Sequence, residues 1–204
     1  QRMQHGLIPL WKKTLKQGEV FKTRKAFMTV CHGGIYKACK NLVDLKESRK
    51  PKNKLENEMP LMYNEYCYTW GKPTEKLVEE QLPLCKELGF KYFVIDAGWY
   101  CKEDGEWRLV GDWELNEKKF PNGLRKLSEK CEEYGMKLGI WFEFESVSRD
   151  SEIAKLHPEW LLTYCGKIIC HGGRCMFDMR KKEVVEYLKE KVINFVKENK
   201  IGYI

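Results

Sequence analysis

The chain has 204 residues, of which 43% are apolar and 33% are charged, an ordinary balance for a globular protein that excludes a disordered chain. Its 37 basic and 30 acidic residues leave a net charge of +7, but lysines and glutamates are interspersed along the predicted helices, so we expect solvated helix faces and no nucleic-acid partner. The sequence contains no run of about 18 apolar residues, so we expect no membrane span.

The N-terminal part of the chain differs in pattern from the rest. Residues 18–31 alternate between polar and apolar side chains, as an exposed pair of strands does. Residues 35–45 have the apolar spacing of a helix, and the lysine-rich segment that follows indicates a linker. The predicted organisation is a first unit over residues 1–45, a linker over 46–59 and a second unit over 60–204.

From residue 60 onward, short apolar runs alternate with amphipathic helical patterns. Thr74 caps the first of these predicted helices, and Gly89 and Gly135 end the first and the second. This order predicts parallel strands joined by helices, either in an open doubly wound sheet or in a barrel. The predicted strands are 61–67, 92–96, 137–142 and 202–204, and the predicted helices are the one between Thr74 and Gly89, 124–134 and 181–199.

The nine cysteines are an odd number without a regular framework. Several fall at apolar positions of predicted helices and strands, where cysteine acts as a small hydrophobic residue, and this usage predicts a reducing, cytoplasmic compartment. A zinc site is the alternative for one group. Four residues separate successive cysteines in that group, whereas zinc ribbons have about two, so we expect free thiols there instead of a metal. The group consists of Cys165, Cys170, His171 and Cys175.

Polar and aromatic residues gather at the C-terminal end of each complete predicted strand. A barrel brings these ends around one site, whereas an open sheet binds its ligand at a switch point, and no glycine-rich phosphate loop follows any strand. The sequence therefore favours a barrel. Carboxylates accept hydrogen bonds from hydroxyls, and indoles cover apolar ring faces, which predicts a pocket for a polyhydroxylated ligand. The candidates are Asn64, Glu65, Tyr66, Trp70, Asp96, Gly98, Trp99, Tyr100, Asp112, Trp113, Trp141, Glu143, Glu145, His171, Arg174 and Asp178.

Each candidate also has a purely structural interpretation. A single tryptophan near a strand end is more often a core residue than a ligand contact, and Asp96 can cap the loop that follows it. Glu143 and Glu145 can hydrogen-bond to neighbouring backbone groups. The case for a pocket therefore rests on the group of residues and not on any single one.

Five short motifs follow one another along the second unit: Val94-Ile-Asp-Ala-Gly-Trp-Tyr100, Gly111-Asp-Trp113, Phe120-Pro-Asn-Gly-Leu124, Gly139-Ile-Trp-Phe-Glu-Phe-Glu145 and His157-Pro-Glu-Trp160. In order and spacing this part of the chain, about Leu61 to Ile204, resembles glycoside hydrolase family 36, the bacterial α-galactosidases. A weaker similarity over 18–43 resembles the end of that family's N-terminal β-sandwich and its helical link. The resemblance implies an α/β fold, the first half of a TIM (β/α)₈ barrel preceded by the tail of a β-sandwich domain.

The resemblance implies a retaining glycoside hydrolase that cleaves terminal α-linked galactose from oligosaccharides. Such an enzyme needs a carboxylate nucleophile and a separate acid/base but no cofactor or metal. In the family the nucleophile belongs to a Lys-x-Asp motif on the fourth strand, so we expect it just after Ile204, no catalytic residue within the 204 residues, and no turnover by them alone. The expected partners are α-galactoside oligosaccharides, and a homo-oligomer is left open. The alternatives are an α-galactosyl transglycosylase, a glycosidase of altered sugar specificity and, from another class, a non-catalytic carbohydrate-binding fragment.

Carried over position by position, the resemblance also implies sugar contacts. Asp96 corresponds to an aspartate that binds the C4 or C6 hydroxyl, and Trp113 corresponds to an indole that lines the pocket. Arg174 corresponds to an arginine that contacts the sugar. Tyr66 stands where the family has an aromatic residue, usually tryptophan.

One position departs from the family pattern. Two aspartates usually precede Gly-Trp in the family, and here the second is Ala97. Its loss removes charge-assisted hydrogen bonds worth about 1.5–3 kcal/mol each. Either Glu65 on the neighbouring strand replaces the missing carboxylate, or the sugar specificity has shifted.

Overall fold

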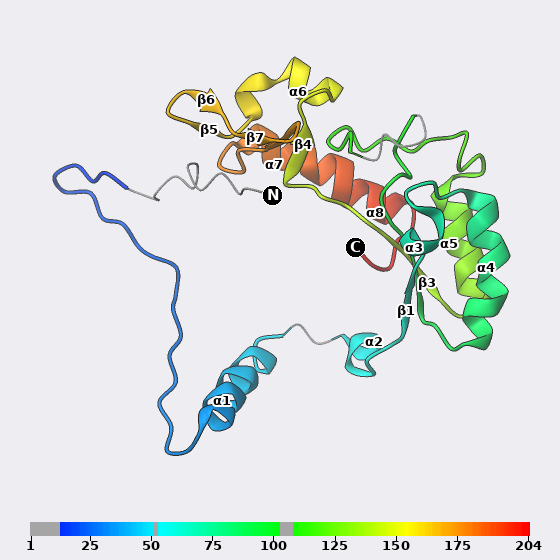
Figure 1. Ribbon diagram of the computed structural model, residues 1–204, viewed down its shortest axis with the longest axis horizontal. Coiled ribbons are helices and arrows are strands. Elements are labelled where there is room, and N and C mark those ends of the chain that lie inside the picture. The colour runs from blue at the N-terminus through cyan, green and yellow to red at the C-terminus, as the bar shows by residue number, and fades with distance from the viewer. Residues whose placement is uncertain (1–12, 51–52, 103–107) are drawn as a thin grey trace. The chain divides into compact units, whose positions relative to one another are not determined.

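The computed structural model describes residues 13–50, 53–102 and 108–204, and the chain divides into two compact units, residues 1–58 and 59–204 (Figure 1). The first unit contains helices α1 (Ile35–Glu47) and α2 (Lys54–Asn57). α1 contains the predicted helix over 35–45. The predicted pair of strands over 18–31 is wrong, because these residues form no strand. An alternating pattern gives a stable strand only where a partner strand supplies ladder hydrogen bonds, and the described residues supply none to this segment.

A parallel sheet forms the centre of the second unit. Its strands are β1 (Met62–Asn64), β2 (Tyr92–Ile95) and β3 (Lys137–Ile140), in that order, and Tyr203 adds a parallel bridge beside Gly139. Three of the four predicted strands are therefore confirmed, although each is shorter than predicted, and the fourth, 202–204, is represented by the single bridge at Tyr203. β1 ends early because the side chain of Asn64 accepts a hydrogen bond from the Tyr66 N–H at 2.9 Å, which turns the chain into helix α3 (Tyr66–Thr69).

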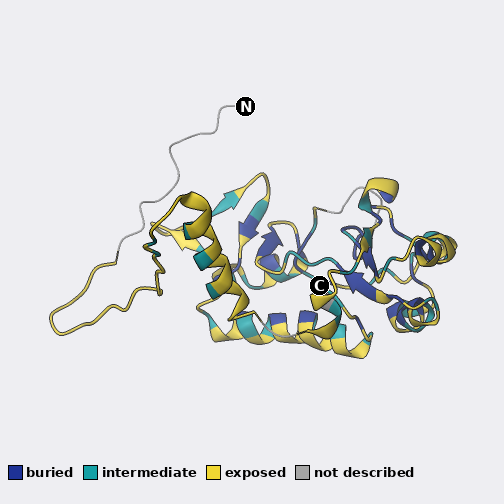
Figure 2. Ribbon diagram, turned by 90° about the horizontal axis from the view of Figure 1, so that it is seen from below, coloured by how far each residue is buried: buried dark blue, intermediate teal, exposed yellow. Residues whose placement is uncertain are grey.

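The three helices that the periodicity predicts are confirmed. They are α4 (Glu75–Glu87), α5 (Gly123–Glu133) and a long final helix in three segments: α7 (Lys182–Leu188), the π-helical η2 (Lys189–Asn194) and α8 (Phe195–Glu198). The Thr74 hydroxyl accepts the Leu77 N–H at 3.2 Å and caps α4 as predicted. Figure 1 shows α4 and α5 on the same side of the sheet, where their apolar faces pack on the strands. Figure 2 shows buried positions on these strands and on the inner helix faces.

A small antiparallel layer, which the sequence does not predict, follows β3. β8 (Arg174–Met176) lies between β4 (Ser146–Ser148) and β7 (Cys170–His171), and a separate hairpin joins β5 (Thr163–Tyr164) to β6 (Lys167–Ile168). In sequence, helix α6 (Glu152–Leu156) and the 3₁₀ turn η1 (Pro158–Trp160) lie between β4 and β5. The layer has an apolar cluster of its own, which consists of Val147, Ala154, Leu161, Cys175, Phe177, Val184 and Leu188.

One cysteine prediction is wrong. Cys170 and Cys175, expected to be free thiols, form a disulfide, because β7 and β8 place them opposite each other. The other described cysteines are free. Across residues 13–50, 53–102 and 108–204, no helix combines the length and apolar character that a membrane crossing requires.

Candidate functional site

Asp96 lies directly after β2, at the edge of the sheet where the parallel strands end. Its carboxylate accepts hydrogen bonds from the Asn64 side chain at 2.6 Å and from the Ala97 N–H at 2.7 Å. Asn64 is the last residue of β1, so the ends of two neighbouring strands fix the orientation of one partly buried carboxylate. Ala97 itself is buried, which leaves Asp96 as the acidic side chain of this pair of positions.

Glu65 lies behind Asp96 and is only 1% exposed. One carboxylate oxygen accepts the Asp96 N–H at 2.8 Å, and the other accepts the hydroxyl of Thr69. Burial raises the pKa of Glu65 above its ordinary value, and the nearby Asp96 charge acts in the same direction. Both oxygens are therefore engaged inside the protein, where they join the end of β1 to the end of β2.

Arg174 reaches the same edge of the sheet from β8. Its guanidinium forms an ion pair with Glu143, which follows β3, and both side chains are partly buried. The pKa of the Tyr100 phenol is strongly raised, mainly by burial. The charges of Arg174, Glu143 and Asp96 also influence this pKa. Tyr100 therefore stays protonated, and its hydroxyl can donate a hydrogen bond.

Trp113, predicted to line the pocket, lies in the core with 2% of its surface exposed. Its ring is stacked with Trp99 at a centroid distance of 6.0 Å and meets Tyr100 edge-on at 5.0 Å. Trp141, one of the predicted pocket residues, is partly buried directly after β3, and its ring is stacked with Tyr100 at 6.3 Å.

The residues around Trp113 explain its position. The Asp112 carboxylate accepts the backbone N–H groups of Glu152 and Ile153 at 3.1 and 2.9 Å and so caps α6. The Tyr187 hydroxyl donates to the Gly111 carbonyl at 2.7 Å. The Gly-Asp-Trp motif therefore connects the loop after β2 to α6 and α7, and its tryptophan is directed into the core.

In the described structure, Tyr66 and Asp178 make their contacts with residues other than Arg174 and Glu143. Tyr66 is partly buried, and its ring packs against Trp70 at 5.9 Å. The Asp178 carboxylate accepts two hydrogen bonds from the Arg180 guanidinium, both at 2.7 Å, and this contact lowers the pKa of Asp178. In the part of the chain that the structure describes, no group of three or more His, Cys, Asp or Glu side chains is arranged to hold a metal ion.

The structure thus gathers Asp96, Tyr100, Trp141, Glu143 and Arg174 at one edge, with Glu65 behind them. This strand-end cluster combines hydrogen-bond acceptors, a guanidinium donor, a phenol donor and an indole. Such a set suits a neutral ligand with several hydroxyl groups.

Comparisons with known proteins agree with this chemistry. The Melibiase family model matches residues 20–204. α-Galactosidase Mel36A of Lactobacillus acidophilus is 30% identical over 196 residues, which are 95% of this chain and 26% of that protein. α-Galactosidase AgaA of Geobacillus stearothermophilus is 29% identical over 206 residues, which are 100% of this chain and 28% of that protein. The chain therefore spans about a quarter of the length of the curated relatives it matches.

Solved structures give the same result. The α-galactosidase of Lactobacillus brevis superposes with a TM-score of 0.65 at 32% identity, over 71% of this chain and 20% of that one. The family 36 α-galactosidase AgaB of Geobacillus stearothermophilus gives 0.63 at 33% identity, over 68% and 19%. Because the Melibiase family model matches nearly the whole length of this chain, the chain belongs to the Melibiase family.

Proposed function

We propose that the strand-end cluster is part of the galactose pocket of a retaining α-galactosidase. The main observation behind this proposal is that hydrogen bonds orient the carboxylate of Asp96 at the edge of the sheet where the Arg174–Glu143 pair also lies. Support comes from the relatives, which are α-galactosidases by name, and from structures of AgaA in complex with raffinose and stachyose. Both are oligosaccharides, the ligand class that we assign to the whole protein.

We propose that the second unit is the first half of a (β/α)₈ barrel. The strand order supports this, because the fourth parallel segment, at Tyr203, lies beside β3 and continues in the same direction. In a doubly wound sheet the order would turn back to the other side of the first strand. The first unit, by the same proposal, belongs to the end of a β-sandwich domain. A cytoplasmic location stays a prediction.

Each side chain of the cluster has a proposed role. Asp96 accepts hydrogen bonds from sugar hydroxyls, Arg174 donates to one, and Trp141 covers the apolar C–H face of the ring. Tyr66 borders the pocket, while Trp113 supports it from the core and Glu65 holds Asp96 in place. Cleavage with retention requires two further carboxylates about 5–5.5 Å apart, and the nucleophile stays predicted just after Ile204.

Saturation-transfer NMR with methyl α-galactoside tests the pocket, since it detects weak binding. We expect transfer to the galactoside and less to methyl α-glucoside. Asp96→Asn should weaken the signal several-fold, because it replaces a charge-assisted acceptor by a neutral amide. Glu87→Gln, which removes one charge from an exposed position of α4, is the matched control. Equal transfer to both glycosides, or an unchanged signal for Asp96→Asn, would contradict the assignment. Hydrolysis of nitrophenyl α-galactoside by the 204 residues would contradict the predicted place of the nucleophile.

A further inference from the structure

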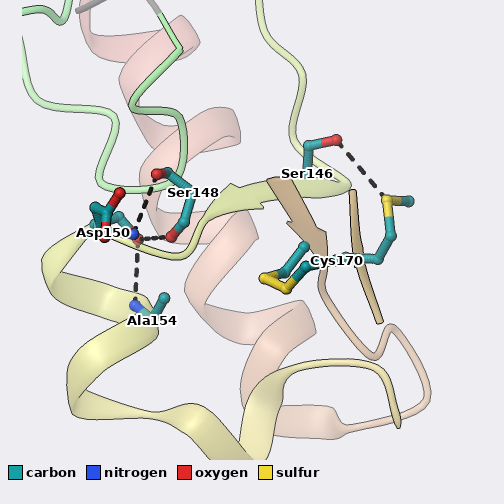
Figure 3. Close-up of a disulfide and its surroundings, with 8 residues drawn as sticks. Ser146, Ser148, Asp150, Ala154 and Cys170 are labelled. Atoms are coloured by element: carbon teal, nitrogen blue, oxygen red, sulfur yellow. Dashed lines mark hydrogen bonds between the residues drawn. A yellow bond between two sulfur atoms is a disulfide. The ribbon is translucent and has the colours of Figure 1, made fainter. Parts of the chain in front are cut away.

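Cys170 and Cys175 form a covalent link across a short hairpin. They are opposite each other in the pairing of β7 with β8, and the sulfur–sulfur bond closes the hairpin beside β4 (Figure 3). The turn between them contains Gly172 and Gly173, with φ angles of 57° and 84°, a region that glycine adopts freely. Two glycines give this turn little stiffness of its own.

The two edges of β8 differ in how many residue pairs they form with the neighbouring strand. On one side, β4 pairs with it over three residues, and Cys175 is fully buried in the apolar cluster next to Val147. On the other side, β7 contributes only two residue pairs, and Cys170 is partly buried. A two-residue strand on a flexible turn is marginal without further support. The disulfide supplies that support.

The same hairpin carries the cationic side chain of the strand-end cluster. Arg174 is the neighbour of Cys175, lies opposite Ser148 of β4 and His171 of β7, and forms its ion pair with Glu143. The backbone of the turn is anchored once more, where the Arg149 N–H donates to the Gly173 carbonyl at 2.9 Å. The register of β7 on β8 therefore bears directly on where the guanidinium lies.

We propose that Cys170 and Cys175 form a reversible dithiol/disulfide site whose oxidised form holds the Arg174-bearing hairpin in register. The reductant is a dithiol. Its thiolate attacks the sulfur of the more accessible Cys170, and Cys175 leaves as a thiolate that takes up a proton. The second thiol of the reductant then displaces Cys170 and closes the reductant into its own disulfide. Two electrons and two protons pass to the cysteine pair, and the reverse reaction restores the link.

Reduction removes a covalent constraint from a closed loop of six residues, Cys170 to Cys175. In the chain-entropy description this raises the population of the open hairpin on the order of tenfold or more. β8 stays paired with β4, so the change is confined to β7, the turn and the register of Arg174. This site is independent of the identity of the ligand.

Hydrogen exchange followed by mass spectrometry of the 204-residue protein tests the proposal without a sugar. After equilibration with oxidised dithiothreitol, peptide mapping should find Cys170 linked to Cys175. Reduced dithiothreitol should then speed amide exchange over residues 170–176 about tenfold or more, with little change in β1–β3. Reoxidation should restore slow exchange.

Two variants make the test specific. Cys170→Ser breaks the pair but leaves buried Cys175 in place, and it should exchange at the reduced rate whether or not dithiothreitol is present. Cys165→Ser removes an exposed free thiol of the same segment and should behave like the unmodified protein. The proposal is overturned if the link does not form under oxidising conditions, if reduction leaves exchange over 170–176 unchanged, or if Cys170→Ser still responds to the dithiol.

Discussion

Glu65 and Asp96 are neighbouring carboxyl groups in different surroundings. Asp96 is partly exposed and is oriented by an amide donor and a backbone donor. Glu65 is buried and accepts hydrogen bonds from a backbone N–H and a hydroxyl, and no cationic side chain of the described residues pairs with it. The position that resembles the family's sugar-binding aspartate thus depends on a second carboxyl group that is directed inward.

The raised pKa of Glu65 predicts a pH dependence of stability. Because the folded state binds the proton more tightly than the unfolded state, the contribution of Glu65 is fully present below pH 4.5 and falls as the pH rises through the raised pKa. Each tenfold by which the folded state binds this proton more tightly corresponds to about 1.4 kcal/mol. Glu65→Gln mimics the protonated form. Its free energy of unfolding should therefore increase relative to that of the unmodified chain as the pH rises through the raised pKa of Glu65.

Urea unfolding between about pH 4 and 8 measures this difference. Glu87→Gln serves as the control, because that side chain is exposed on α4 and should show no comparable trend. A constant difference between Glu65→Gln and the unmodified chain across this range would show that Glu65 does not titrate as its burial requires.

At the scale of elements, the loops after β1 and β2 touch at Gly98. Its φ angle is 111°, and a Cβ atom added there would lie 2.1 Å from the carbonyl oxygen of Gly71. Gly98→Ala should lower the free energy of unfolding by about 3 kcal/mol or more, because backbone must move against backbone. At Gly89, after α4, φ is 81° and an added Cβ meets nothing within 4 Å, so Gly89→Ala should cost only roughly 1–2 kcal/mol. If urea unfolding showed equal losses of free energy of unfolding for Gly98→Ala and Gly89→Ala, the close approach of Gly98 to Gly71 would be refuted.

Sequence patterns predict elements whose stability is local. β2 is a fully apolar run, and α4 has its cap and its spacing within one segment, so both are predicted correctly. The layer of β4, β7 and β8 is not predicted, because strands of two or three residues depend on their partners and on the Cys170–Cys175 link. In the site, Asp96 is recognised by its place after β2. The inward direction of Trp113 cannot be predicted, because a sequence does not show which side of a loop an indole occupies.

At the scale of the whole molecule, the two compact units differ in how much they bury. Helix α1 has no buried residue, whereas the second unit has the strands and the large apolar cluster. We therefore expect residues 59–204 to unfold at nearly the same temperature as the whole chain, within about 2 °C, since a loss of 1 kcal/mol would shift the midpoint by about 2–4 °C.

Calorimetry of the two proteins measures this. Removal of residues 1–64 is the contrasting deletion, because it also takes away β1 and should lower the midpoint clearly. A large drop on removal of residues 1–58 alone would mean that the first unit stabilises the second.

The aromatic packing behind the site has an optical consequence. Trp99 is completely buried, donates its indole N–H to the Trp141 carbonyl at 2.9 Å, and lies 6.0 Å from the ring of Trp113 with an angle of 24° between the planes. Indole transitions at that separation couple, so these rings form a chromophore pair with a fixed mutual orientation. The near-ultraviolet circular dichroism of the protein therefore reports on the wall that supports the strand-end cluster, without any added label.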